Sequence, residues 1–535
     1  MEVNFKKLEL VKKYQPKIIK LKLASNRPPL YNFIRFWGRL PDYLLDDLIT
    51  YFKEKGKSTL FDPFGGSGSV MFKGIESGIR EIIYNDLNSA FTFITESIYK
   101  GLYIPRNILE SNINSLILSL TQSPIIRDLQ QMDNMRISKI VFDKWIILNS
   151  NIKLPEDRNK EINKIEKKVI KYLIDKKQIP YSLLRDKIAK EVAKKGYTKI
   201  TARAIASLTI KKLLKKKIIS ERIKKEAFIV SIKVNNSFCS KTVRFNEKLE
   251  KIMNKKEKKY QLLINEDVFS YPLYYNSDTL FEKAENVRVI GDLYPTWSKI
   301  FLSVIWKEIE DKKYDANTTN VFKTCFLASL YDSSLMQMPH KSGWIVKSFW
   351  IPTPCAVKNP LDVFIKKLKK FLDVHDYFQE KIKNKTNVKI YNKNILDFSL
   401  NEFEKRPDIV ITHPPYFSTI QYGELSAIWS AWLKQKIPFE EEIVENVRQN
   451  KNKEVYLRLL KEALKKIILL AKNNADIVFI FQSKDQGHWE MLDGVLIDLP
   501  IELEEIRCYR RSAWWDSSHL FNIGNYDYAL IFKKR

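Results

Sequence analysis

The stretch Ser58-Thr59-Leu60-Phe61-Asp62-Pro63-Phe64-Gly65-Gly66-Ser67-Gly68-Ser69 decides the fold. The run from Ser58 to Phe61 is short and apolar and predicts a strand, and the glycines from Gly65 to Gly68 predict a tight turn. A helix-like run from Val70 to Ser77 follows. This succession of strand, glycine turn and helix is typical of the start of an α/β domain.

A second strand and a second helix follow in the same order. Glu81 to Tyr84 is strand-like and ends at Asn85-Asp86, and Asn88 to Tyr99 has the pattern of a helix. Alternating strands and helices build an open, mostly parallel sheet, because each helix returns the chain to the start of the next strand. We therefore expect an α/β fold with a Rossmann-like topology.

The same alternation resumes near the end of the chain. The runs that indicate strands there are Val388–Tyr391, Asp408–Thr412, Asp476–Gln482 and Tyr526–Phe532. We predict that residues 1–104 and 385–535 form one α/β domain, with a long insertion between its two halves.

The insertion divides into three predicted regions. Residues 105–164 are predicted to form a helical connector, and residues 241–384 a helical region that packs on the α/β domain. Between them, residues 165–240 show three apolar helical stripes, followed by β-branched residues around Lys224-Lys225 that indicate a small hairpin within Lys217 to Val234. Three helices and a hairpin predict a winged helix.

Basic residues cluster beside the third helix of this predicted winged helix. They are Lys211, Lys212, Lys215, Lys216 and Lys217. We interpret them as a DNA-contacting surface, because a helix of this kind can enter a duplex groove while lysines contact phosphates. The alternative is a solvated lysine face on a protein-interaction module.

The charge balance of the chain points to a polyanionic partner. The 535 residues include 92 lysines and arginines against 63 aspartates and glutamates, a formal charge of +29. A proteome that uses lysine on every solvated face gives the same balance. The four cysteines and five histidines show no spacing typical of a metal site or a disulfide framework. Because the chain has no apolar run long enough to span a membrane, we expect a cytoplasmic protein.

The glycine turn is predicted to bind a cofactor. It lacks the Lys-Ser/Thr pair of a triphosphate-binding loop, and the lead-in Asp62-Pro63-Phe64 is foreign to the dinucleotide fingerprint. It fits a cofactor that needs close backbone approach and an acceptor for an ammonium group, as S-adenosylmethionine does. Asp86, at the end of the second strand, is placed to bind two ribose hydroxyls or, alternatively, to cap the next helix.

A second segment with chemical potential is Ile409-Val410-Ile411-Thr412-His413-Pro414-Pro415-Tyr416-Phe417, a buried-type strand followed by two prolines and two aromatic residues. The prolines fix the backbone and remove two amide donors, which leaves main-chain carbonyls free to accept. The ring of Tyr416 can stack on a planar base. The loop is therefore suited to holding an amino group.

These motifs together resemble the amino-methylating DNA methyltransferases, the N6-adenine and N4-cytosine enzymes. His413-Pro414-Pro415-Tyr416 is similar to their Asp/Asn/Ser-Pro-Pro-aromatic motif, and Asp62 to Ser69 to their cofactor loop. The segments 342–352 and 422–433 are similar to a prokaryotic subgroup. The resemblance implies an S-adenosylmethionine site made by Asp62, Pro63, Phe64, Gly65, Gly66, Ser67, Gly68, Asp86, Leu87 and Asp397.

The resemblance implies a site-specific DNA methyltransferase of a restriction-modification or phage-defence system, with a partner protein from that system. Its catalytic domain would be residues 1–104 and 385–535, and residues 241–384 would include a target-recognition region. An adenine or cytosine flipped out of the duplex would stack on Tyr416, while the Pro414 carbonyl and the side chain at position 413 accept its amino hydrogens. His413, Pro414, Pro415 and Tyr416 are thus the implied catalytic residues.

Position 413 departs from the family's pattern. Aspartate, asparagine and serine present an oxygen acceptor, whereas histidine accepts only through the unprotonated nitrogen of its neutral ring. Two alternatives therefore stay open beside a DNA methyltransferase. One is an RNA base amino-methyltransferase, and the other is a catalytically weakened subunit that binds the cofactor and DNA.

Overall fold

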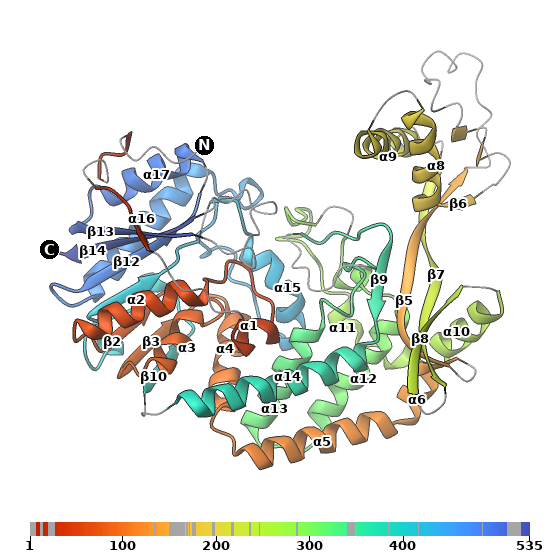
Figure 1. Ribbon diagram of the computed structural model, residues 1–535, viewed down its shortest axis with the longest axis horizontal. Helices are drawn as coiled ribbons and strands as arrows, with labels where there is room; N and C mark the ends of the chain where they lie inside the picture. The colour runs from red at the N-terminus through yellow and green to blue at the C-terminus, as the bar shows by residue number, and fades with distance from the viewer. Residues whose placement is uncertain are drawn as a thin grey trace.

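The chain folds around one large sheet, to which helical layers and a second, smaller sheet are added (Figure 1). The computed structural model describes residues 7–10, 14–19, 27–132, 135–148, 166, 169–170, 172–173, 178–194, 198–215, 219–234, 237–244, 247–284, 287–339, 348–382, 386–415, 417–483, 485–510 and 526–535.

The large sheet has the strand order β1-β13-β14-β12-β11-β2-β3-β10. The bounds are β1 (Lys17–Ile19), β2 (Thr59–Asp62), β3 (Glu81–Asn85), β10 (Asn387–Tyr391), β11 (Ile409–Thr412), β12 (Asp476–Phe481), β13 (Ile501–Arg510) and β14 (Tyr526–Lys534). Only β14 runs antiparallel to its neighbours, β12 and β13. The prediction of an α/β fold with a mostly parallel sheet, built from both ends of the chain, is confirmed.

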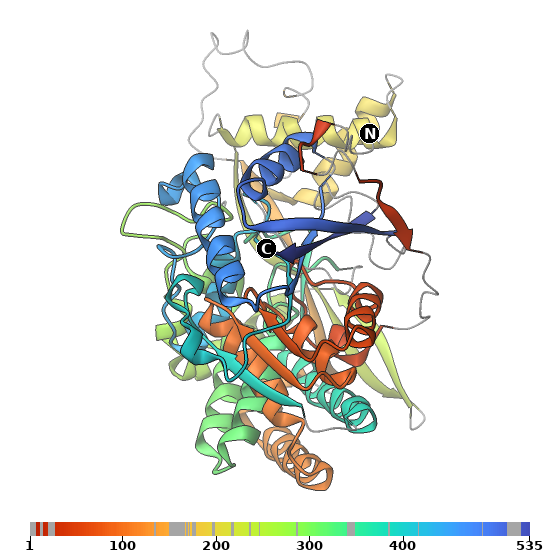
Figure 2. The ribbon, with the colours of Figure 1, turned by 90° about the vertical axis from the view of Figure 1, so that its left-hand side faces the viewer.

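Helices cover both faces of this sheet, because successive strand residues point to opposite faces. Leu60 of β2 belongs to one hydrophobic core and its neighbour Phe61 to the other. The first core includes α1 (Pro29–Phe33), α2 (Asp42–Glu54), α3 (Ser69–Glu76), α4 (Ser89–Gly101) and α15 (Tyr422–Leu433), and the second includes α16 (Lys453–Leu470) and α17 (Gln486–Leu496). Figure 2 shows the two helical layers on opposite sides of the strands.

The order of the strands creates a crevice at one edge of the sheet. β3 and β10 lie on one side of β2 in the sheet, whereas β11 and β12 lie on its other side. The connections therefore diverge between β2 and β11. In open α/β sheets, ligands bind outside the carboxyl ends of the strands at such a divergence.

The helices of the insertion share the first hydrophobic core with the sheet. Their bounds are α5 (Arg106–Gln122), α6 (Pro124–Gln130), α10 (Glu247–Tyr260), α11 (Glu266–Phe269), α12 (Thr296–Asp311), α13 (Ala316–Ser329) and α14 (Pro360–Lys381). Buried residues of one continuous cluster run from Leu48 in α2 to Phe301 in α12 and Phe371 in α14. Residues 247–381 therefore pack against the large sheet through its helical layer.

The prediction that residues 105–164 form a helical connector is wrong beyond α6. Residues Met135–Leu148 form a long strand, β5, which pairs antiparallel with β7 (Ile219–Val234). The remaining strands of the second sheet are β4 (Gln131–Met132), β6 (Gln178–Pro180), β8 (Ser237–Arg244) and β9 (Cys355–Lys358). Residues 135–148 are held as a strand by pairing with a segment far away in the sequence. Their own residue pattern therefore does not identify them as a strand.

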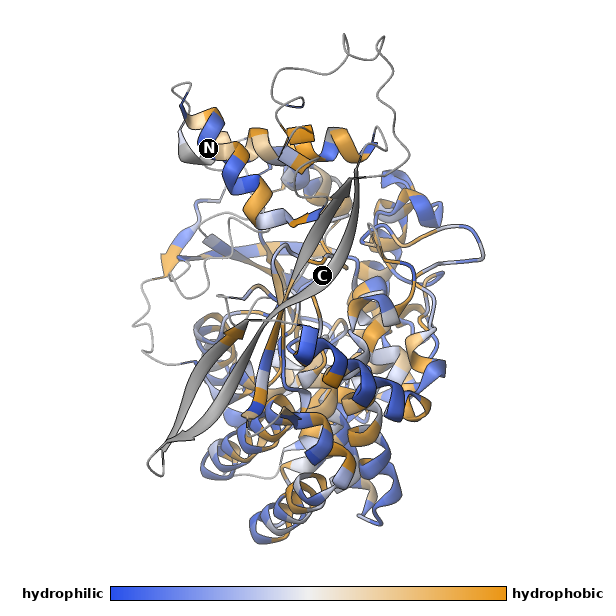
Figure 3. Cartoon of the chain, turned by 90° about the vertical axis from the view of Figure 1, so that its right-hand side faces the viewer, coloured by the Kyte–Doolittle hydropathy of each residue, from blue (hydrophilic) through white to orange (hydrophobic). Residues whose placement is uncertain are grey.

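The small hairpin predicted within Lys217 to Val234 is also wrong. Residues 219–234 form one continuous strand through Lys224-Lys225, with β5 on one side and β8 on the other. The predicted helices are closer to the structure. α8 (Tyr181–Ala193) and α9 (Lys199–Lys215) are helical and pack with Val169, Ile170 and Leu173 in a separate core. Figure 3 shows hydrophobic and hydrophilic residues alternating along these helices at the top of the view. We call residues 166–215 the distal module.

The distal module lies at the end of the β5–β7 ribbon, away from the large sheet (Figure 1). Lys211 and Lys215 are exposed on α9. The side chain of Lys212, together with Lys216 and Lys217, lies outside the described part of the chain. No described helix is long and apolar enough to cross a bilayer.

Candidate functional site

A deep pocket lies at the divergence of the large sheet. Its walls come from the loops that follow β2, β3, β10 and β11, and from the segment 36–40 before α2. It encloses about 1060 Å³ when the part open to solvent is included, which is the size of a ligand cleft. Of the predicted cofactor residues, eight line it: Asp62, Pro63, Phe64, Gly65, Gly66, Ser67, Asp86 and Leu87. The segments 62–67 and 86–87 thus meet as the sequence predicts.

The glycine turn is held rigidly at the floor of this pocket. Gly66 and Gly68 have φ of 48° and 70°, a conformation that residues with a Cβ adopt at a cost. The Gly65 amide donates to the Asn85 carbonyl at 2.8 Å, and the Tyr84 hydroxyl donates to the Gly66 carbonyl at 2.8 Å. The end of β3 therefore fixes the loop that follows β2.

Two carboxyl groups share the pocket, the buried Asp62 and the half-buried Asp86. Asp62, at the end of β2, is 2% exposed, and burial, reinforced by the nearby Asp86, raises its pKa well above the usual range. Burial also raises the pKa of Asp86, to about 6, against the opposing hydrogen bonds from Asn88 and Gly66. Within the described part of the chain, neither carboxylate has a lysine or arginine ion-pair partner. The pocket is therefore suited to a cationic ligand.

Asp86 joins the glycine turn to the start of α4. Its Oδ2 accepts from the Gly66 amide at 2.7 Å and its Oδ1 from the Asn88 amide at 2.8 Å. The cap of α4 is Asn88, whose side chain accepts from the Ala90 amide at 3.1 Å. The alternative that Asp86 serves as the helix cap is therefore wrong.

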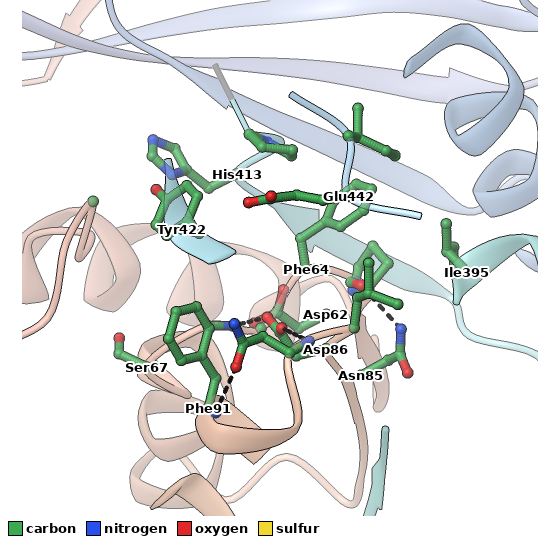
Figure 4. A pocket seen from close by; sticks show the side chains of 18 of the residues that line it. Asp62, Phe64, Ser67, Asn85, Asp86, Phe91, Ile395, His413, Tyr422 and Glu442 are labelled. Atoms are coloured by element: carbon green, nitrogen blue, oxygen red, sulfur yellow. Dashed lines mark hydrogen bonds between the residues drawn. The ribbon is translucent and has the colours of Figure 1, made fainter. Parts of the chain in front are cut away.

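The predicted catalytic loop faces the same pocket. His413 and Pro415 line it, and Figure 4 shows His413 on the opposite side from Asp62 and Asp86. The Tyr456 hydroxyl donates to the Pro415 carbonyl at 2.9 Å, which anchors the loop to α16. Pro414 lines a smaller apolar cavity beside α16 instead. Tyr416 lies outside the described residues.

Phe417 completes the loop in a strained conformation. Its φ is 42°, and its buried ring stacks on the His488 ring with a centroid distance of 4.1 Å and an interplanar angle of 15°. The stacking holds the end of the proline loop against α17. Two segments separated by most of the chain, 62–67 and 413–415, thus form one site.

No protein-family model, curated protein or solved structure matches this chain.

Two predicted cofactor residues do not line the pocket. Gly68 is the N-cap residue of α3, and Asp397 is exposed in the 3-10 helix η5 (Ile395–Asp397). The pocket wall after β10 consists of Lys393, Asn394 and Ile395. Asn394 caps η5 by accepting from the Leu396 amide at 3.0 Å, and this tight turn carries Asp397 beyond the wall.

Arg39 is a pocket residue that the sequence argument missed. Its Nη1 donates to the carbonyls of Leu30 and Ile34 at 3.1 and 3.2 Å, whereas Nε and Nη2 are buried and make no hydrogen bond within the described residues. Burial lowers its pKa to about 10, so the guanidinium stays charged at neutral pH. No sequence pattern marked it, because an arginine between a glycine and a leucine looks like an ordinary surface residue.

Glu442 is the second missed residue. It lies in the loop after α15 and lines the pocket together with Tyr422 and Gly423. Its Oε1 accepts from the Gly423 amide at 2.8 Å. It belongs to three successive glutamates at 440–442, which look like a solvated run, so the sequence gives no sign that the carboxylate of one of them turns inward.

Proposed function

We propose that this protein is an S-adenosylmethionine-dependent methyltransferase that modifies the exocyclic amino group of an adenine or cytosine in DNA. One observation carries the proposal: two carboxyls without a basic ion-pair partner in the described residues, the buried Asp62 and the half-buried Asp86, lie in the same pocket as His413 and Pro415 of the proline loop. A cationic cofactor on one side and an amino group on the other account for both halves of the pocket.

The residues of the pocket fit the parts of S-adenosylmethionine. Asp62 would bind the ammonium group and Asp86 the ribose hydroxyls, while the free donors of Arg39 suit the carboxylate. Phe64, Leu87 and Ile395 offer apolar walls for the adenine. When bound, the cofactor supplies a methyl group on a positively charged sulfur.

The residues of the chain hold the target and exclude water. The rigid proline loop, anchored through Tyr456 and Phe417, would keep the base in place with its amino group toward His413. His413 must be neutral to accept a hydrogen from that group, since a protonated ring donates and also repels the cationic cofactor. The aromatic residues Phe36 and Trp37 close the pocket beside Gly38.

DNA is the proposed polyanion because of the charge of +29 and the basic α9. The distal module at the end of the ribbon would contact the duplex while the large sheet holds the extruded base. This arrangement fits a long substrate with contacts far from the reacting atom. The restriction or defence setting, and the partner protein it implies, rest on the sequence resemblance alone.

Sequencing of modified bases tests the function. DNA from cells that produce the protein is compared with DNA from cells that produce Tyr416→Ala, and purified protein is titrated with S-adenosylmethionine by calorimetry. We expect one methylated sequence motif, present only with the unaltered chain. Binding without methylation would favour the cofactor-binding subunit, methylation of RNA alone would favour the RNA enzyme, and no binding would refute the proposal.

The affinity for S-adenosylmethionine is expected to rise with pH. Because burial raises the pKa of Asp86 to about 6 and that of Asp62 well above its ordinary value, the ligand-free protein holds protons there in mild acid. A bound cation favours the ionised carboxylates, so binding releases protons and strengthens between about pH 5 and about pH 8. Calorimetry in two buffers of different ionisation enthalpy measures this release; an affinity that is independent of pH would contradict the expectation.

Removal of the distal module is expected to separate DNA binding from cofactor binding. Leu148 of β5 is paired with Ile219 of β7, so an Asn-Gly turn can replace residues 149–218 and close the ribbon as a hairpin. The module has its own hydrophobic core, so the other two cores stay intact. We expect unchanged affinity for S-adenosylmethionine and at least ~10-fold weaker DNA binding in a filter-binding assay. Unchanged DNA affinity would assign the module another role.

A further inference from the structure

Glu442 has the position of a reacting group rather than of a structural one. It comes from the loop between α15 and α16, and it lines the pocket on the side of His413. Figure 4 shows its carboxylate directed toward the part of the pocket where His413 and Tyr422 lie. No sequence motif marks it, and the site described so far gives it no task.

The two oxygens of Glu442 differ in their contacts. Oε1 accepts from the Gly423 amide at 2.8 Å, whereas Oε2 is buried and makes no well-formed hydrogen bond within the described residues, with the Gln449 side chain as its nearest polar neighbour. A Cβ on Gly423 would come within 2.8 Å of Oε2, so the glycine is what permits this close packing. A buried carboxylate oxygen without a donor is costly unless a ligand provides one.

The surrounding charges keep this carboxyl near its ionisation point. Burial, with a smaller contribution from Glu424, raises the pKa of Glu442 to about 7, and the Gly423 amide, Lys451 and the Gln449 side chain oppose the rise. Lys451 donates from Nζ to the main-chain carbonyls of Phe439 and Glu442, so it stays close without bonding the carboxylate. Tyr422 and His413 face the group from α15 and the proline loop, and the exposed Glu441 adjoins it in sequence.

We infer that Glu442 accepts a hydrogen bond from the exocyclic amino group of the target base and takes the proton that this nitrogen loses when it is methylated. The inference rests on the proposed function and names a catalytic residue for it. Position 413 then needs no oxygen, because Glu442 accepts one of the two amino hydrogens and the neutral His413 ring accepts the other.

The proton and electrons balance in this step. The amino nitrogen uses its lone pair to form the bond to the methyl carbon, and the electron pair of the old bond stays with the donor sulfur. The nitrogen then has one proton too many and a positive charge. Ionised Glu442 takes that proton, which leaves a neutral methylated amine, and passes it on to water.

The test compares the unaltered protein with Glu442→Gln and with Glu440→Gln as a matched control. Glu440 lies in the same loop, is exposed and does not line the pocket. In Glu442→Gln the amide can still accept from the Gly423 amide, but it places an NH₂ donor where Oε2 was. Glu442→Asp keeps the negative charge but has a side chain shorter by one methylene, so its carboxylate lies further from the target base. It provides a second variant if Glu442→Gln does not fold.

Two measurements are made on the sequence motif identified by base sequencing. The first is the affinity for a duplex with the target base, against the same duplex with a keto group in place of the amino group: hypoxanthine for adenine, or uracil for cytosine. The second is the rate of methylation between about pH 5.5 and about pH 8.5. The affinity for S-adenosylmethionine is measured alongside by calorimetry.

For the unaltered protein and Glu440→Gln, we expect at least ~10-fold tighter binding to the amino-bearing duplex and a rate that rises around pH 7. For Glu442→Gln, we expect equal affinity for the two duplexes and unchanged affinity for the donor. The rate of methylation should fall by at least ~100-fold and should no longer rise around pH 7. Retention of the rate and the preference by both Glu442 variants would overturn the inference while the function stands. A loss explained entirely by weaker donor binding would also overturn it. No donor binding by the unaltered protein would refute the proposed function itself.

Discussion

Asp62→Asn is expected to weaken S-adenosylmethionine binding by at least ~30-fold. Loss of one partner of a buried charge pair costs about 2–5 kcal/mol, and each 1.4 kcal/mol is tenfold in affinity. Asparagine has nearly the volume of aspartate and can still accept from the Phe64 amide, so only the charge is lost. Calorimetric titration of the purified variant measures the effect.

The same variant is expected to keep or increase its stability without ligand. Since Asp62 is 2% exposed and lies beside Asp86, its ionised form is costly to bury, whereas an amide is less so. The free energy of unfolding in urea should therefore not fall at neutral pH. Asp311→Asn, at the exposed end of α12, serves as the control, with unchanged affinity and stability. A variant of Asp62 that binds normally would remove this carboxylate from the site.

Trp429→Ala is expected to lower the free energy of unfolding by about 3–5 kcal/mol, the usual cost of emptying a buried aromatic site. The indole of Trp429 is 1% exposed, and its Nε1 donates to the Leu327 carbonyl at 3.2 Å. Its ring packs with Trp37 at a centroid distance of 5.2 Å and with Phe36 and Phe91 at 6.0 Å. The substitution therefore empties a contact between α15, α4 and the segment before α2.

The loss should extend to the ligand, because Phe36, Trp37 and Phe91 also line the pocket. We expect weaker S-adenosylmethionine binding together with a lower unfolding midpoint. Trp350→Ala is the matched control, since that indole is 39% exposed and should cost within ~0.5 kcal/mol. Equal stability of the two variants would mean that the aromatic cluster does not support the pocket wall.

The local motifs were predictable because each rests on a short-range rule. A strand of apolar residues, glycines that adopt positive φ at Gly66 and Gly68, and a helix that starts at Ser69 follow from the residues themselves. The carboxyl ends of parallel strands meet at one edge of a sheet, so the sequence alone lets Asp62, Asp86 and His413 be expected in one crevice. All three line the pocket.

The errors fell where distant segments decide the local structure. Residues 135–148 and 219–234 are strands because they pair with each other, although the distal module separates them in the sequence. Nothing in the residue pattern of either segment identifies the other as its partner. Asp397 was misplaced because the tight turn of η5, capped by Asn394, sets where its side chain lies. These outcomes depend on pairing and burial, which a linear pattern does not encode.

By itself the sequence determined the α/β class, the rigid glycine and proline loops, and the acidic residues at the ends of the strands, because backbone stereochemistry and residue periodicity act over a few neighbouring positions. Only the tertiary structure decided that Arg39 and Glu442 join the pocket and that the distal module stands at the end of the paired strands β5 and β7. The reason is physical: burial depends on what the rest of the chain places around a side chain, and the sequence does not distinguish the half-buried Glu442 from the two exposed glutamates beside it.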